Sequence, residues 1–203
     1  KLKNYFQFEK VELINDFAVL IYGIPFLKEN QFKTLQNNTN KNNNFEGYHA
    51  IVGAGTGLGI SRGIISNTKI FLLPSEGGHI EFAPKTNEEW ELKQWIKNYL
   101  NIERVSYERI VSGEGLANIS KWKFSKEDIR DHPFNLYLKK ANESNISEKI
   151  LAEKICELAK EGDPLMAGIE RLWFNAYSSF IGDLAVHELC FGGLWISGGT
   201  APK

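Results

Sequence analysis

Residues 48–65 read YHAIVGAGTGLGISRGII and have the clearest strand pattern in the chain. Apolar, β-branched runs at Tyr48–Val52 and Ile60–Ile65 flank the glycine-rich segment Gly53–Gly59, and a third such run follows at Lys69–Leu73. Short runs of this kind bounded by glycine and asparagine are typical of β-strands, and two runs joined by a glycine loop are typical of a hairpin. The stretch therefore predicts a hairpin with a glycine-rich tip, followed by a third strand.

Helical patterns follow the strands. Residues 86–89 (TNEE) match a capping box, and apolar residues come after them at helical spacing. Ser147 is a candidate N-cap for a second helix, and Asp163-Pro164 opens a third in the favoured order of N-cap and first helical residue. Gly192-Gly193 is predicted to end the third helix before a final strand, Leu194–Ser197. Strands, helices and a returning strand together predict a mixed α/β domain.

The N-terminal part has a different pattern. Val11–Ile14 is a short apolar run that predicts a buried strand, and Asn15-Asp16 stand at its carboxyl end, the edge at which open α/β sheets usually bind ligands. The run Phe17–Leu27 is apolar all round, which predicts a buried helix that Pro25 ends or kinks. Seven of the fifteen residues in Asn30–Asn44 are asparagine, so a surface loop is expected there.

Composition excludes several classes of protein. With 203 residues, 42% hydrophobic and 24% charged, the chain has the make-up of a globular domain. Its longest uncharged apolar stretch has eleven residues, too few to span a bilayer, and a net charge of −1 provides no basic footprint for nucleic acid. The two cysteines, Cys156 and Cys190, form no CxxC pair, which predicts reduced, buried thiols in a cytoplasmic protein.

The glycine loop is the first candidate site. Gly53–Gly59 carries glycine at every second position, so its backbone N–H groups are free to converge on an anion, and Thr56 adds a hydroxyl. The loop is not a dinucleotide fingerprint, because the third glycine of that motif would fall on Leu58, and no Gly-Lys-Ser/Thr follows to make a P-loop. Taken alone, such a loop is more often a flexible hairpin tip or a bulge.

The second candidate site lies in residues 76–84 (EGGHIEFAP). Glu76 and His79 flank a glycine pair just after a strand, an arrangement that can aim a carboxylate and an imidazole at one small polar ligand. Each signal has a plainer reading. A lone histidine is more often a satisfied loop residue, Asn15-Asp16 can simply start a turn, and Glu108 can be a solvated charge on a helix face. No cluster resembles a metal site built by the protein.

Taken together, the segments resemble the bacterial-type glucokinase family. The matches occur in the family's order and cover nearly the whole chain, and they are weakest in the Asn-rich loop and in Lys121–Asn145. The segments that carry the resemblance are 13–18 (LINDFA), 53–59 (GAGTGLG), 76–84 (EGGHIEFAP), 108–113 (ERIVSG) and 192–202 (GGLWISGGTAP).

The resemblance implies an actin-like (ribonuclease-H-like) sugar kinase fold, mostly its large lobe, with a mixed sheet and flanking helices. Residues 1–26 would be a remnant of the small lobe and the hinge, and residues 27–203 the large lobe, in which 30–44 form a surface loop. The rest of the small lobe, with its aspartate-and-glycine phosphate loop, and the C-terminal helix would lie outside this chain. The chain begins at Lys1 and its only methionine is Met166, so it is expected to be an excerpt of a longer protein.

The resemblance also implies roles for individual residues. Asp16 would be the general base that accepts the proton of the sugar's 6-hydroxyl, a role that suits a carboxylate because a hydroxyl is a poor nucleophile. The sugar site would consist of Asn15, Asp16, Glu76, His79 and Glu108. The ATP site would include Gly53, Gly55, Thr56, Gly57, Gly198 and Gly199. Magnesium would be held mainly through the phosphates of ATP and water, with no metal ligand from the protein.

The expected function is ATP-dependent phosphorylation of glucose to glucose 6-phosphate, the first step of glycolysis, in the cytoplasm. The full-length protein would be a homodimer that binds glucose and ATP and neither nucleic acid nor membrane. Two alternatives remain open at this point: a catalytically inactive sugar-sensing homologue, and a kinase for another hexose. An N-acetylhexosamine kinase of the repressor–kinase group is less similar, because its zinc-bearing pattern of three clustered cysteines is not matched by Cys156 and Cys190.

Overall fold

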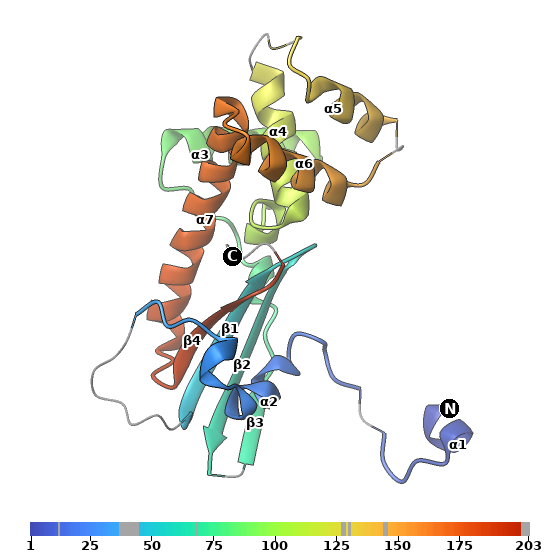
Figure 1. Ribbon diagram of the computed structural model, residues 1–203, viewed down its shortest axis with the longest axis vertical. Coiled ribbons are helices and arrows are strands. Elements are labelled where there is room, and N and C mark those ends of the chain that lie inside the picture. Colours follow the sequence, from blue (N-terminus) through green and yellow to red (C-terminus); the bar gives the residue numbers. More distant parts are fainter. Residues whose placement is uncertain are drawn as a thin grey trace.

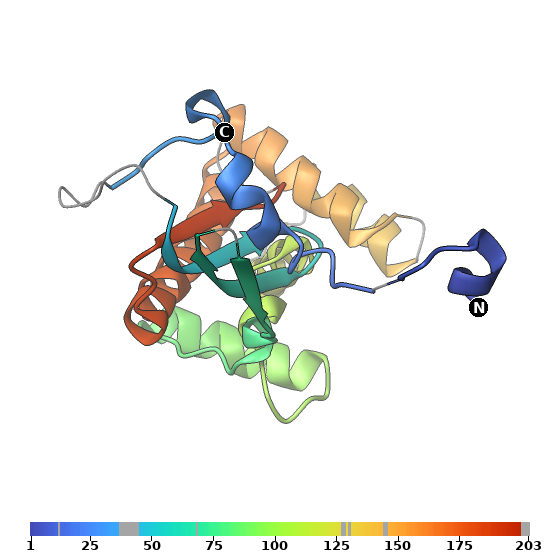
Figure 2. The ribbon, with the colours of Figure 1, turned by 90° about the horizontal axis from the view of Figure 1, so that it is seen from below.

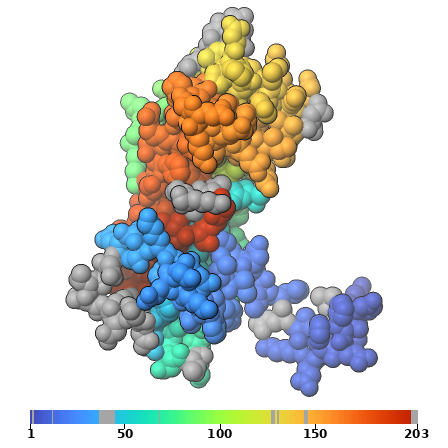
Figure 3. All heavy atoms as spheres, in the orientation of Figure 1, coloured from blue at the N-terminus to red at the C-terminus, as the bar shows by residue number. Residues whose placement is uncertain are grey.

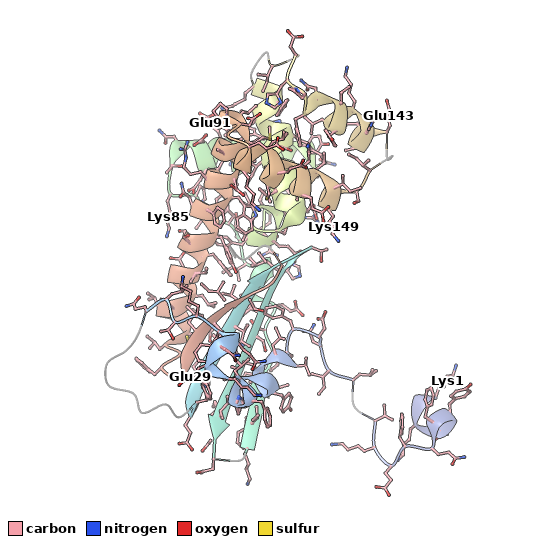
Figure 4. All side chains as sticks on the ribbon, in the orientation of Figure 1. Lys1, Glu29, Lys85, Glu91, Glu143 and Lys149 are labelled. Atoms are coloured by element: carbon pink, nitrogen blue, oxygen red, sulfur yellow. The ribbon has the colours of Figure 1, made fainter. Side chains whose placement is uncertain are left out.

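The computed structural model describes residues 1–11, 13–36, 45–67, 69–126, 129, 131–143 and 146–199. A group of helices lies above a twisted sheet, and the long helix α7 (Pro164–Glu188) runs from that group down beside the sheet (Figure 1). The short N-terminal helix α1 (Leu2–Phe6) stands apart from the body, to which it is joined by a narrow segment (Figure 3). In Figure 4, Lys1 marks that distant end, Glu29 lies beside the sheet, and Glu91, Glu143 and Lys149 lie in the helical part.

The sheet has four strands in the order β3-β2-β1-β4. They are β1 (Gly47–Ala54), β2 (Leu58–Ser66), β3 (Lys69–Leu73) and β4 (Gly193–Ser197). The first three pair antiparallel, whereas β4 pairs parallel to β1. The predicted hairpin, third strand and final strand are therefore confirmed, and the sheet is mixed, as the fold prediction requires.

The two faces of the sheet have different neighbours, because successive side chains of a strand point to opposite faces. Val52 and Ala54 of β1 belong to the main core, which the helices complete. Ile51 belongs to a smaller cluster with Ile21 and Ile24, which come from the segment that lies across the other face (Figure 2).

The predicted helix starts are largely confirmed. Helix α3 (Asn87–Tyr99) begins with the predicted capping box, in which Thr86 and Glu89 each bond the other's backbone N–H. The Asp163 carboxylate accepts from the N–H groups of Leu165 and Met166, both at 3.0 Å, and so caps α7. Helix α6 (Glu148–Lys160) does begin after Ser147, but the serine side chain makes no capping bond.

Three of the described helices, α1, α4 and α5, were not predicted. Helix α4 (Gly113–Lys126) is buried on most sides, so its sequence lacks the one-sided apolar period that marks a surface helix. Helix α5 (Asn135–Asn142) is short and largely polar. Both pack in the helical part, where Trp122 of α4 and Leu138 of α5 join the main core.

A partly buried polar cluster fastens the last turn of α7 to the sheet. Arg62 Nη1 donates to Glu188 Oε1 at 3.2 Å, and the Tyr48 hydroxyl also donates to the Glu188 carboxylate. Burial by itself would raise the pKa of Glu188, but the Tyr48 hydroxyl and the Arg62 guanidinium outweigh it and lower that pKa. The carboxylate thus stays charged and joins three elements.

The prediction of a buried strand at Val11–Ile14 is wrong. The described residues of this stretch form no strand, and the Leu13 side chain is 89% exposed. A strand forms only where a neighbour takes up its backbone hydrogen bonds, and the described sheet contains no strand from this segment.

The buried helix expected over Phe17–Leu27 is also wrong in part. The segment holds one helical turn, α2 (Leu20–Gly23), and a 3₁₀ turn, Ile24–Phe26, which contains Pro25. Only Ile21 and Ile24 are buried, and Phe26 is 79% exposed. An apolar sequence cannot bury all its sides when the fold places a neighbour on only one of them.

The remaining predictions have mixed outcomes. Residues 32–36 of the expected Asn-rich loop have no helix or strand, and 37–44 lie outside the described residues. Cys156 and Cys190 are free thiols, but both are partly exposed rather than buried. Burial raises the pKa of Cys156 to about 11, with Glu170 adding to the effect, so this thiol stays protonated at neutral pH. Within the described residues, no helix combines the length and apolar character needed to cross a membrane.

Candidate functional site

The sequence-predicted site residues come together in one cleft of about 390 Å³ at the tip of the hairpin. Its walls come from the segment before α2, the β1–β2 turn, and two 3₁₀ turns, Gly77–His79 and Tyr107–Arg109. The cleft is lined by Asn15, Asp16, Phe17, Gly53, Ala54, Gly55, Thr56, Gly57, Leu58, Gly59, Ile60, Ser75, Glu76, Gly78, His79, Glu108 and Gly198. Of the predicted set, only Gly199 is missing from this lining.

Asn15 and Asp16 form a tight turn at one wall. Asn15 Oδ1 accepts from the N–H groups of Phe17 at 2.9 Å and Ala18 at 3.0 Å, and Asp16 Oδ1 accepts from Phe17 N–H at 2.8 Å. The plainer reading, in which these residues start a turn, is therefore correct for Asn15. The same turn leaves the Asp16 side chain exposed at the cleft.

The hairpin tip forms another wall. Gly55 N–H donates to Gly57 O at 2.8 Å, which closes a tight turn with Thr56 exposed at its apex. Gly113 N–H, at the start of α4, donates to Gly55 O at 2.8 Å. The tip is thus fastened from behind to the first turn of a buried helix and is not a loose loop.

Three titratable side chains lie in a row along the cleft. His79 Nε2 lies 3.8 Å from Glu76 Oε2, and His79 Nδ1 lies 3.7 Å from Glu108 Oε1. Exposure falls along the row, from 84% for the Glu76 side chain to 55% for His79 and 27% for Glu108. Such a row offers a sugar-sized ligand several hydrogen-bonding groups at graded depth.

Glu108 is not the solvated helix-face charge of the plainer reading. It lies on a 3₁₀ turn, and its Oε2 accepts from Leu58 N–H at 3.0 Å, just after the hairpin tip. A Cβ atom on Gly57 would come within 2.5 Å of this oxygen, so the glycine makes room for the carboxylate. The two predicted sites, sugar and phosphate, are therefore in direct contact through Glu108.

Buried residues behind the cleft hold Glu108 in place. Ser112 Oγ donates to Glu108 O at 2.7 Å, and Trp173 Nε1 of α7 donates to Ser112 O at 3.1 Å. Burial raises the pKa of the preceding Tyr107 to about 12, with Asp183 adding to the effect. That hydroxyl therefore remains a neutral donor, 3.4 Å from Asp183 Oδ2.

Of the glycine pair after β4, Gly198 lines the cleft and Gly199 does not. Gly198 has a φ of +104°, and a side chain there would strike the carbonyl of Ala54, so the backbones of β4 and β1 approach closely at the cleft. Gly199 does not line the cleft, and residues 200–203 of the predicted adenosine segment lie outside the described residues.

The charge in the cleft is mostly negative. Asp16, Glu76 and Glu108 supply carboxylates, and no lysine or arginine is among the described lining residues. Across the described part of the chain, no three His, Cys, Asp or Glu side chains gather closely enough to hold a metal ion. A phosphate bound here would therefore rely on backbone N–H groups and on cations that it brings with it.

Sequence reasoning missed two features of the site. Phe17 lines the cleft with its ring against the hairpin, and the Leu58 N–H group holds Glu108. An aromatic residue next to the Asn-Asp pair was the only sequence signal for the first. A backbone N–H leaves no signal in the sequence, so the second could not have been found.

Comparisons with known proteins identify the family. The glucokinase family model matches residues 1–203. The chain is 36% identical to the glucokinase of Nostoc sp. over 201 residues, which are 95% of this chain and 57% of that protein. It is also 36% identical to the glucokinase of Synechocystis sp., covering 96% of this chain and 56% of that protein.

A crystal structure of a glucokinase from an Antarctic psychrotroph superposes with a TM-score of 0.69 at 29% identity. The match covers 98% of this chain and 55% of that one, which confirms the predicted fold. The chain thus spans a little over half the length of the relatives that it matches.

Proposed function

The chain belongs to the glucokinase family, and on that premise we propose that it carries the hexose site and part of the ATP site of an enzyme that phosphorylates glucose at its 6-hydroxyl. One observation carries the proposal. A single cleft joins the Asp16 carboxylate, the row Glu76–His79–Glu108 and the Gly55–Gly57 turn. Phosphoryl transfer needs an acceptor and a donor side by side, and this cleft has a wall suited to each.

On the sugar side, Asp16 accepts the proton of the 6-hydroxyl as that oxygen bonds to phosphorus. Its Oδ1 is occupied by Phe17 N–H, so Oδ2 is the oxygen suited to this role. Asn15 uses its oxygen in the turn, which leaves its amide N–H₂ to donate to a sugar hydroxyl. His79, Glu76 and Glu108 bind other hydroxyls of the sugar.

On the phosphate side, the turn at the hairpin tip binds the terminal phosphates of ATP. Gly53, Gly55 and Gly57 let the backbone approach the phosphates closely, Thr56 offers its exposed hydroxyl, and Gly198 lies beside them. ATP enters with magnesium held by its phosphates and by water. Gly199 is proposed to contact the nucleotide from outside the described cleft.

The proposed cleft also accounts for selectivity among ligands. Carboxylates that expect hydroxyl partners lose hydrogen bonds when a hydroxyl is missing, and partly buried groups such as Glu108 then remain without a partner. Loss of a matching hydroxyl should therefore weaken binding strongly. The proposal extends to a cytoplasmic location and to a homodimer of the full-length protein.

The test is a coupled assay of the full chain encoded by the gene, with ATP, magnesium and a panel of hexoses. We expect glucose-dependent ADP release, with ³¹P NMR identifying glucose 6-phosphate as the product. Asp16→Asn, purified in the same way, is the control for contaminating host kinases. Size-exclusion chromatography of the same sample tests the dimer.

Other outcomes decide against the proposal in specific ways. Phosphorylation of a different hexose in preference to glucose would make the protein a kinase for that sugar. Hexose binding by calorimetry without phosphate transfer would make it a sugar sensor. If no hexose binds, the proposal of a sugar site in this cleft is wrong.

A further inference from the structure

The ring of Phe17 rests on two glycines that face each other across the hairpin. Gly53 and Gly59 are paired residues of β1 and β2. A Cβ atom on Gly53 would come within 2.8 Å of Phe17 Cζ, and one on Gly59 within 2.7 Å of Phe17 Cγ. Both separations are closer than carbon atoms can approach, so only this glycine pair lets the ring lie against the strands.

The contact continues along β2. Ser61 Oγ donates to Ala18 O at 3.5 Å, and a Cβ atom on Gly63 would come within 2.7 Å of Ile21 Cγ2. Gly59, Ser61 and Gly63 point to one face of β2, because they alternate along the strand. Small residues on that face therefore fix the height of the segment 17–21 above the sheet.

This packing extends to the residue proposed as the base. The Phe17 N–H group donates to both Asn15 Oδ1 and Asp16 Oδ1. The position of the Phe17 backbone, which its ring fixes on the glycine pair, thus determines where both side chains lie. The Gly55–Gly57 turn follows directly, with only the Ala54–Leu58 pair between it and the glycine pair.

We propose that Phe17 is a positioning residue, which sets the Asp16 carboxylate at a fixed distance from the hairpin tip through its seat on Gly53 and Gly59. The inference rests on the proposed function. It assigns to Gly53 and Gly59 a role in seating the ring, in addition to any approach of the backbone to phosphate. It also places the sugar-side base and the phosphate-side turn on one rigid unit.

A flat ring suits this seat because it presents its face to the two glycines. A branched aliphatic side chain has no flat face and would hold the segment at a different height. A displacement of about 1 Å between reacting groups can lower a rate about 100-fold. Phe17→Leu is therefore expected to lower kcat about 10- to 100-fold while changing the KM values for glucose and ATP less than threefold.

The decisive measurement is a double-mutant cycle in the full chain encoded by the gene. Phe17→Leu is introduced into the natural sequence and into Asp16→Asn, and kcat is measured for all four proteins. If Phe17 acts through Asp16, its substitution causes little further loss once the carboxylate is gone. An equal fold-loss in both backgrounds would show a general structural effect and overturn the inference.

Gly59→Ala disturbs the same contact by changing the glycine instead of the ring. Its nearest new neighbours are all atoms of the Phe17 ring, so the ring must move. We expect a loss of kcat similar to that of Phe17→Leu, again absent in the Asp16→Asn background. Gly168→Ala in α7 is the matched control, because a Cβ atom there meets nothing within 4 Å, and its kcat should be unchanged.

The outcomes separate this inference from the proposed function. If Asp16→Asn keeps its activity, the assignment of the base fails, whatever Phe17 does. If Asp16→Asn is inactive but Phe17→Leu and Gly59→Ala stay within twofold of the natural protein, only the positioning role fails. If Phe17→Leu does not fold, the Gly59→Ala cycle decides alone.

Discussion

The two faces of the sheet differ in what they bury. On the face toward the helices, Val52, Leu58 and Ile60 enter a core that extends through α3, α4, α6 and α7. On the other face, glycine and serine receive the segment 17–21, and only a small cluster around Ile51 is buried. The large side chains hold the fold together, and the small ones leave room for the site.

This difference predicts how substitutions on each face affect stability and activity. The helix-facing core is extensive and closely packed, so damage there should lower stability and affect activity only through loss of the folded state. The other face carries Asp16, whose exposed side chain accepts a hydrogen bond from Phe17 N–H. Damage there should lower activity at nearly constant stability.

The largest expected effect is that of Asp16→Asn on turnover. Loss of the carboxylate that accepts the 6-hydroxyl proton should lower kcat about 10²- to 10⁴-fold. The KM for glucose should change far less, because asparagine keeps the shape and the turn. Steady-state kinetics measures kcat and KM, and thermal unfolding shows whether the variant is as stable as the natural protein. A kcat within tenfold of the natural protein would contradict the assignment.

The comparison of the two faces predicts a difference between two isoleucines. Ile119→Ala, in the helical core, should cost about 3–5 kcal/mol of stability, within the range known for buried isoleucine. Ile51→Ala, in the small cluster, should cost about 2 kcal/mol, because exposed neighbours can move into the space. Both side chains are almost fully buried, at 0% and 3% exposure. Equal losses of unfolding free energy in denaturant titrations would contradict the predicted difference between the two faces.

Within the cleft, His79→Ala and Thr56→Val should have different effects, the first on glucose binding and the second on ATP binding. His79→Ala should raise the KM for glucose about 2- to 13-fold, since a typical hydrogen bond contributes about 0.5–1.5 kcal/mol. Thr56→Val should raise the KM for ATP and leave glucose binding nearly unchanged. Calorimetry with glucose and with ATP measures both affinities for each variant. Weaker ATP binding by His79→Ala and weaker glucose binding by Thr56→Val would contradict the assigned roles.

Much of the fold could be predicted because its signals are local. The capping box at Thr86, the Asp163-Pro164 start and the glycine-tipped hairpin each encode their own geometry. Helix α4 was missed because burial on most sides removes its apolar period. The strand at Val11–Ile14 was wrongly predicted because pairing depends on distant residues that no local pattern reveals.

The site could be assembled from the sequence only through the family resemblance. Asp16, Gly55, His79 and Glu108 lie far apart in the chain, and no spacing rule brings them together. The structure places them in one cleft, but their chemical roles stay predictions. What the sequence could not provide is the contact between layers, such as the seat of Phe17 on Gly53 and Gly59.

The smallest effect belongs to Asp163, at the start of α7 and outside the residues that line the cleft. Burial alone would raise its pKa, but the N–H of Met166 and the nearby His132 outweigh burial and lower it. His132 Nε2 lies 2.9 Å from Asp163 Oδ2. Asp163→Ala removes the cap and should cost about 1 kcal/mol of stability at neutral pH.

The pH dependence of stability distinguishes the contribution of the Asp163 cap from that of its negative charge. Because the folded-state pKa of Asp163 lies below its unfolded value, the charge stabilises the fold above about pH 4 and its contribution disappears as pH falls through the folded-state pKa. Asp163→Asn keeps a capping oxygen without the charge. Its difference from the natural protein in thermal unfolding should therefore shrink between about pH 6 and pH 3, with kcat and both KM values unchanged at neutral pH. No difference at pH 6 would show that the cap, and not the ionised carboxylate, contributes the stability. A changed kcat would show that the helical part is coupled to the cleft more closely than the two faces of the sheet suggest.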